Sequence, residues 1–135
     1  MSDYQRAVDG QNLWSTIQSE IRRECKRTAL LSDFLTRNIL QHQSFEESLC
    51  YILAEKLADG PDKVIEWKHY LQSVIDEQQG RASSLDWCIQ QGAKRDLLCQ
   101  LQGNASIKDH YSPLLFFAGY QALQCYRFAH YCWHN

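Results

Sequence analysis

The spacing of apolar residues is the feature that most restricts the fold of this 135-residue chain. They recur every three or four positions, as in Leu13, Ile17 and Ile21, and not at every second position as strands require. Only two prolines and six glycines interrupt the pattern, and no Asn-Gly or Asp-Gly pair lies between two alternating stretches. The sequence therefore predicts a single all-α domain over residues 1–135, a multi-helix bundle of about six helices.

Local signals place the helix ends. Ser44 followed by Glu47 predicts a capping box, in which the carboxylate reaches back to the N–H of Ser44. Gly60 is expected in a left-handed stop, and Pro61 in the first turn of the next helix. The expected helices cover about residues 12–27, 30–40, 44–58, 61–79, 84–101 and 112–133, with Thr28 capping the second, Ser83 or Ser84 the fifth and Ser112 the sixth.

The core should form from the apolar side of each helix. Gly92, inside the fifth helix, is expected to mark a bend because glycine is a poor helix former. The side chains predicted to face inward are Leu13, Ile17, Ile21, Leu31, Phe34, Leu35, Ile39, Phe45, Leu49, Ile52, Leu53, Leu57, Val64, Trp67, Leu71, Val74, Ile75, Trp87, Ile89, Leu97, Leu98 and Leu101.

The segment from Leu114 to Trp133 is apolar on nearly every side of its predicted helix. A helix that is apolar all round is buried all round, which a lone domain of this size cannot easily arrange. We therefore expect this helix to pack on a second copy, a partner protein or a further segment, unless the hydroxyls of its tyrosines simply point to water. The side chains expected at that interface are Leu115, Phe116, Tyr120, Leu123, Tyr126 and Trp133.

Composition excludes several other classes of function. The net charge is -2 and the Lys and Arg residues are scattered singly between acids, so no nucleic-acid partner is expected. No apolar run approaches the roughly 20 residues that span a bilayer, so no membrane partner is expected either. The start, Met1–Arg6, lacks the apolar stretch of a secretory signal, and we expect a cytoplasmic protein.

The cysteines and histidines give no clear site. Without a secretory signal, the six cysteines are predicted to be reduced and buried. The nearest approach to a metal pattern, near the C-terminus, is better explained by packing, because its members do not share one helix face: Cys125, His130, Cys132 and His134.

Phosphate-loop, His-Glu-x-x-His and Gly-x-Ser-x-Gly motifs are absent. No metal, cofactor or catalytic residue is therefore assigned. His110, beside Asp109 in the polar stretch 103–111, is the one histidine considered for function, and capping of backbone groups is favoured over a general-base role.

Three blocks carry a resemblance to a known family. The stretch 111–133 contains Tyr-Ser-Pro-Leu-Leu, then Gly-Tyr-Gln-Ala-Leu-Gln-Cys-Tyr-Arg, then His and Trp; residues 31–57 and 13–17 supply the other two. In this order the blocks resemble the N-terminal helical domain of the serine acetyltransferases. Between Asp59 and Gln102 the similarity is weak.

The resemblance implies a helical domain that drives assembly, commonly of two trimers into a hexamer, ahead of a left-handed β-helix. In that family acetyl-CoA and the catalytic His and Asp belong to the β-helix, whose repeats this chain does not contain. An Asp-Pro pair of the helical domain helps to hold substrate serine, and it falls here at Asn104-Ala105. Asn104 lacks the charge of the acid, and Asp109 is the alternative if the register differs.

Three hypotheses follow. The chain is the assembly domain of a serine O-acetyltransferase, which makes O-acetylserine for cysteine biosynthesis, and is inactive alone. Alternatively, it is a stand-alone non-catalytic relative that binds another protein as a regulator, an immunity-type partner or a hetero-oligomer subunit. The third hypothesis is an independent enzyme that uses His110 and Asp109.

Overall fold

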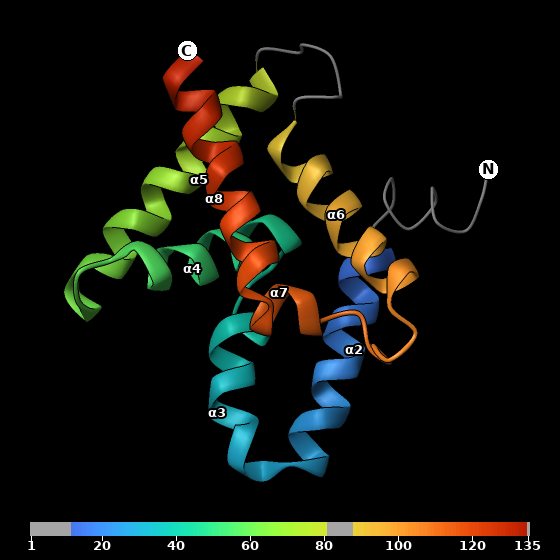
Figure 1. The fold of residues 1–135 in the computed structure, drawn as a ribbon. Coiled ribbons are helices and arrows are strands. Elements are labelled where there is room, and N and C mark those ends of the chain that lie inside the picture. The colour runs from blue at the N-terminus through green and yellow to red at the C-terminus, as the bar shows by residue number, and fades with distance from the viewer. Residues whose placement is uncertain (1–11, 81–87, 135) are drawn as a thin grey trace.

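The computed structural model describes residues 12–80 and 88–134, and these residues form helices and connecting turns with no strand among them (Figure 1). The all-α prediction is confirmed. The expected caps Ser83 and Ser84, and the expected core residue Trp87, lie outside the described residues. The seven α-helices found in the described part are α2 Asn12–Arg27, α3 Ser32–Leu35, α4 Phe45–Leu57, α5 Val64–Gly80, α6 Ile89–Gly103, α7 Ser112–Phe116 and α8 Ala118–His134.

Helix α8 runs through the middle of the molecule, between α5 and α6, and α2 and α3 form a V below it (Figure 1). The stripe Leu13, Ile17 and Ile21 of α2 is fully buried, as predicted. Burial of each such side chain contributes roughly 1.5–3 kcal/mol, so apolar packing holds the helices together. The core also takes Leu35, Ile39, Phe45, Leu49, Cys50, Ile52, Leu53, Leu71, Val74, Ile75, Ile89, Ala93, Leu97, Leu98, Leu114, Leu115, Tyr120 and Phe128.

The second predicted helix is not continuous. Residues 29–31 form a 3₁₀ turn, α3 follows, and residues 36–40 form a π turn. These changes of winding rotate Leu31 off the face shared by Leu35 and Ile39, and Leu31 is exposed. Thr28 does not cap this segment, because its hydroxyl donates to the carboxylate of Glu24.

The ends of α4 are partly as predicted. The N–H of Glu47 donates to the hydroxyl of Ser44 at 3.1 Å, which confirms the cap. The Glu47 carboxylate accepts from the N–H of Gln43, one residue before the predicted donor. Leu57, in the last turn, is exposed, and Gly60 has an extended φ of -179° in place of the predicted left-handed conformation.

The last predicted helix breaks in two at Phe117, whose backbone is extended. The break frees carbonyl groups at the end of α7, and the buried amide of Gln121 donates to those of Leu114 and Leu115 at 2.9 and 3.1 Å. A hydrophobicity pattern cannot predict this break because the group that stabilises it is a polar side chain. Ser112 was expected to cap the helix, but it is the first residue of α7, and its N–H and hydroxyl both donate to the carboxylate of Asp109.

Candidate functional site

The loop between α6 and α7 contains the residues predicted to meet a substrate. Asn104 and Ala105 are both exposed. The Asn104 side-chain oxygen accepts from the N–H of Ser106 at 3.1 Å and from its hydroxyl at 2.6 Å. This oxygen therefore closes a turn within its own loop.

The other end of the loop is fastened to the rest of the domain. One oxygen of Glu20, on α2, accepts from the His110 N–H at 2.8 Å, and the other lies 2.8 Å from Nδ1 of the same histidine. The Asp109 carboxylate accepts from the N–H groups of Tyr111 and Ser112 and from the Ser112 hydroxyl. Both residues considered for chemistry thus hold the loop in place. Glu20 was not among the predicted site residues, and no local pattern links it to a residue 90 positions later.

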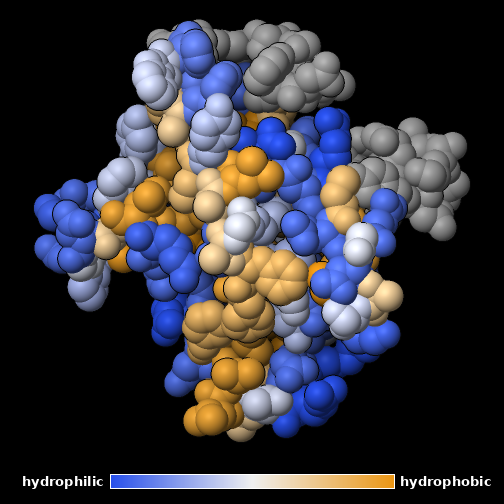
Figure 2. All heavy atoms as spheres, in the orientation of Figure 1, coloured by the Kyte–Doolittle hydropathy of each residue, from blue (hydrophilic) through white to orange (hydrophobic). Residues whose placement is uncertain are grey.

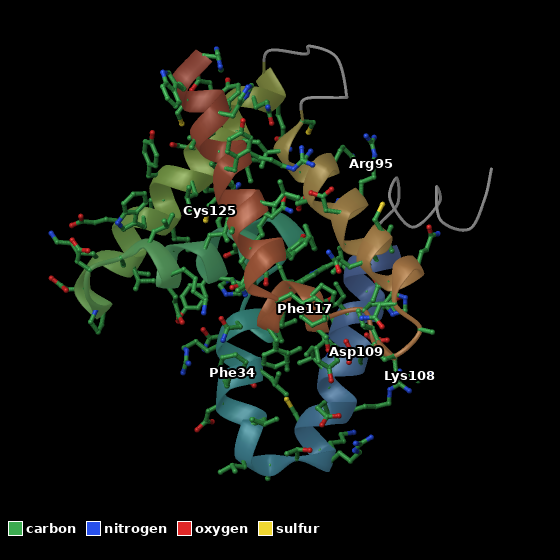
Figure 3. The ribbon with its side chains drawn as sticks, viewed as in Figure 1. Phe34, Arg95, Lys108, Asp109, Phe117 and Cys125 are labelled. Atoms are coloured by element: carbon green, nitrogen blue, oxygen red, sulfur yellow. The ribbon has the colours of Figure 1, made fainter. Side chains whose placement is uncertain are left out.

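A polar groove of about 560 Å³ lies between α2 and this loop. Figure 3 shows Lys108 and Asp109 on the loop beside α2. Burial raises the pKa of the Tyr111 hydroxyl, which keeps it protonated as a hydrogen-bond donor. The groove is lined by both signs of charge, and neither Asn104 nor Ala105 belongs to it; its lining is Glu20, Arg23, Glu24, Arg27, Lys108, Asp109 and Tyr111.

The predicted interface residues divide into two groups. Leu115 and Tyr120 are only 6% and 2% exposed and lie in the domain's own core, so they are not available to a partner in this conformation. The Tyr120 hydroxyl donates to the carbonyl of Ala93 at 2.7 Å, and burial raises its pKa. The side chains that remain open to a partner are Phe116, Leu123, Tyr126 and Trp133, with exposed fractions of 55, 43, 63 and 86%.

Exposed apolar side chains of other elements lie on the same domain. Trp67, which was predicted to face inward, is exposed on α5 together with Tyr70. The Tyr70 hydroxyl lies 3.4 Å from the sulfur of Cys132 on α8. This hydrogen bond to Cys132 raises the pKa of Tyr70. At the α3 end, Phe116 stacks on Phe34 at 6.0 Å between ring centroids. Figure 2 shows apolar surface extending from this end toward the centre of the visible face.

A polar contact fixes α8 against α6. One oxygen of Asp96 accepts from the side-chain amide of Gln124 at 2.9 Å and from the Arg127 guanidinium at 2.9 and 3.2 Å. A Cβ atom at Gly92 would lie 2.7 Å from that guanidinium. The absence of a side chain at Gly92 therefore makes room for Arg127. From the sequence, Gly92 was predicted to mark a bend, which is a different role.

None of the six cysteines, all of which lie in the described residues, forms a disulfide bond. Cys50 is buried, while Cys99 and Cys132 are exposed against expectation. Burial raises the pKa of Cys50 to about 12, which leaves it a neutral thiol. Within residues 12–80 and 88–134, no three His, Cys, Asp or Glu side chains converge as a metal site would require. None of the helices in that same range combines the length and the apolar composition needed to cross a bilayer.

Comparison with known proteins gives one consistent result. Residues 13–125 match the family model described as the N-terminal region of serine acetyltransferase. The chain is 34% identical over 124 residues to the serine acetyltransferase of Buchnera aphidicola subsp. Acyrthosiphon pisum, and 25% identical over 123 residues to that of Escherichia coli K12. Each alignment covers 91% of this chain but only 42% of the relative.

Solved structures agree with the sequence comparisons. A truncated serine acetyltransferase apoenzyme superposes with a TM-score of 0.81 at 25% identity, covering 92% of this chain and 48% of that one. The Neisseria gonorrhoeae serine acetyltransferase superposes with a TM-score of 0.77 at 25% identity, covering 90% and 44%. The chain thus spans less than half the length of the proteins that it matches.

Proposed function

The chain belongs to the family of serine acetyltransferase N-terminal domains, and on this premise we propose that it is the assembly domain of a serine O-acetyltransferase. It holds copies together, while acetyl transfer from acetyl-CoA to L-serine, a step of cysteine biosynthesis, takes place outside these residues. The coverage of only 42% of the relatives supports a helical module that is one part of such an enzyme.

The observation that carries the assembly role is the outward side of α8. Leu123, Tyr126 and Trp133 are exposed although the domain already has a closed core on the inward side of the same helix. Large aromatic side chains are enriched in protein interfaces, where they supply much of the binding energy. A second copy of this chain, docked on that side, is the proposed occupant.

The loop supports the absence of activity in this chain alone. His110 is engaged by Glu20, and Asp109 accepts three hydrogen bonds at the start of α7. A general base must reach the proton that it removes, and a carboxylate used as a helix cap is not free to do so.

One observation favours the alternative of a non-catalytic relative that binds a different protein. Where the resemblance places an Asp-Pro pair, Asn104 is uncharged and turned onto Ser106 of its own loop. An uncharged amide cannot attract the ammonium group of serine as a carboxylate does.

Light scattering coupled to gel filtration tests the proposal on the wild type, Leu123→Asp and Leu30→Asp. Leu30 is 92% exposed at the tip between α2 and α3, so its variant is a matched control with the same change of side chain. We expect an oligomer for the wild type and the control, and a self-association at least about tenfold weaker for Leu123→Asp, because a charge is buried without a partner.

Three results would oppose the proposal. An unchanged mass for Leu123→Asp, or a wild type that is monomeric at high concentration, would exclude α8 as a self-association surface. Serine-dependent release of CoA from acetyl-CoA by this chain alone would contradict its inactivity. A monomeric wild type that captures a different purified subunit would support the alternative.

A further inference from the structure

We propose that His130 and His134 form a bidentate site for a divalent transition-metal ion on the last turns of α8. This goes beyond the assembly role, and it concerns the outward side of α8, where His130 lies beside Tyr126. The two histidines are four residues apart, so they lie one above the other on the same helix face. Their ring centroids are 4.4 Å apart, with an angle of 46° between the ring planes.

This spacing suits chelation. A metal held by imidazole nitrogens at about 2.0–2.1 Å needs those two nitrogens roughly 3 Å apart. Rings whose centroids are 4.4 Å apart reach that separation by small side-chain rotations, with no movement of the helix. Histidines at positions i and i+4 of a helix are an established way to bind zinc.

The surroundings orient one ligand and leave the ion accessible. Tyr126 packs on the other side of His130, at 5.8 Å between ring centroids, so the ring of His130 lies between two neighbours. Because the ring is already oriented, binding of the metal ion costs less conformational entropy. His134 is exposed in the single chain, and water molecules would complete the coordination of an ion bound there.

Cys132, although only two residues from either histidine, belongs to another side of the helix. Its sulfur contacts the Tyr70 hydroxyl of α5 at 3.4 Å. Across residues 12–80 and 88–134 there is no converging group of three potential ligands. The site is therefore a two-nitrogen site of modest affinity, distinct from a structural zinc centre with four protein ligands.

The two imidazole ligands also determine which ions the site binds. Imidazole nitrogens prefer Cu²⁺, Ni²⁺ and Zn²⁺, with weaker binding of Co²⁺ and Mn²⁺. Mg²⁺ and Ca²⁺ require oxygen ligands and are not expected to bind.

Calorimetric titration of the untagged chain with Ni²⁺ tests the site, since Ni²⁺ does not oxidise cysteine thiols as Cu²⁺ can. We expect one ion per chain. His134→Ala and His130→Ala each remove one of the two ligands. Since loss of an outer-shell partner alone lowers metal affinity by about 10–100-fold, loss of a ligand should cost at least about tenfold.

His69→Ala is the matched control. His69 is an exposed histidine on α5 with Ile65 and Ser73 one turn to either side, so it cannot chelate through a histidine pair. This variant and Cys132→Ser should bind Ni²⁺ as the wild type does. No binding by the wild type, equal binding by His134→Ala, or an equal loss in His69→Ala or Cys132→Ser would each overturn the proposal. Both histidines lie near the end of the helix, and thermal unfolding without metal checks that their variants remain folded.

Discussion

The inward and outward sides of α8 carry side chains of similar size in opposite surroundings. Inward, Tyr120 and Phe128 are buried together with two glutamines, Gln121 and Gln124. Outward, the largest side chains are apolar or aromatic and exposed. The buried side of this helix therefore contains amide and hydroxyl groups as well as apolar surface.

The difference shows what decides burial here. Each inward polar side chain donates to a specific partner: Tyr120 to the carbonyl of Ala93, Gln121 to the freed carbonyls at the end of α7, and the Gln124 amide to the carboxylate of Asp96. Only the side-chain oxygen of Gln124 is buried without a hydrogen bond among these groups. A buried polar group is tolerated when it is hydrogen-bonded, and these bonds also fix how α8 packs. On the outward side, Leu123, Tyr126 and Trp133 stay exposed, and this is the side that we propose as an interface.

The largest expected effect comes from truncating an aromatic residue on each side. Phe128 is 4% exposed, so Phe128→Ala should lower the free energy of unfolding by about 3–5 kcal/mol through lost burial and a cavity. Tyr126→Ala, at 63% exposure, should change it by no more than about 0.5 kcal/mol. Urea unfolding at low protein concentration measures both values without a contribution from self-association. If both substitutions lowered the free energy of unfolding equally, the inward and outward sides of α8 would not differ in burial.

A smaller effect tests whether polar contacts hold the inward side. Asp96→Ala removes the acceptor of Gln124, which is fully buried, and of Arg127. A buried donor left unpaired costs roughly 1–3 kcal/mol, so we expect a loss of about 2 kcal/mol in free energy of unfolding. Glu66→Ala, which removes only an exposed partner of Lys63, is the control and should cost less than about 0.5 kcal/mol. If Asp96→Ala left the free energy of unfolding unchanged, apolar packing alone would hold the inward side of α8.

The features predicted from the sequence are those fixed by nearby residues. The stripe of α2 and the cap of Ser44 depend on spacings of three and four positions, and both are present in the structure. The helical fold follows from the same spacings. Family membership was indicated by three short blocks of sequence and is shown by the match over residues 13–125.

The features that were missed depend on distant partners. The bond between His110 and Glu20 joins residues 90 positions apart, and no local pattern shows it. The break at Phe117 depends on a glutamine amide that scores as polar in any hydrophobicity pattern. For the same reason Leu115 and Tyr120 were predicted at an interface, although the domain itself covers them. An apolar pattern tells which residues avoid water, but the polar partners decide which of them face inward.

The smallest expected effect concerns Gly92, where the inward side of α8 meets α6. Alanine is favoured over glycine in a helix by about 1 kcal/mol, so Gly92→Ala would ordinarily stabilise the domain. Here the new Cβ would lie 2.7 Å from the Arg127 guanidinium and would push it away from Asp96. The two effects oppose each other, and we expect a net loss of no more than about 1 kcal/mol. In an Arg127→Ala background the obstacle is gone, and the same substitution should stabilise by about 0.5–1 kcal/mol. Urea unfolding of the four proteins gives the coupling between the two positions. If Gly92→Ala stabilised both backgrounds equally, Arg127 would not require the space that the glycine leaves.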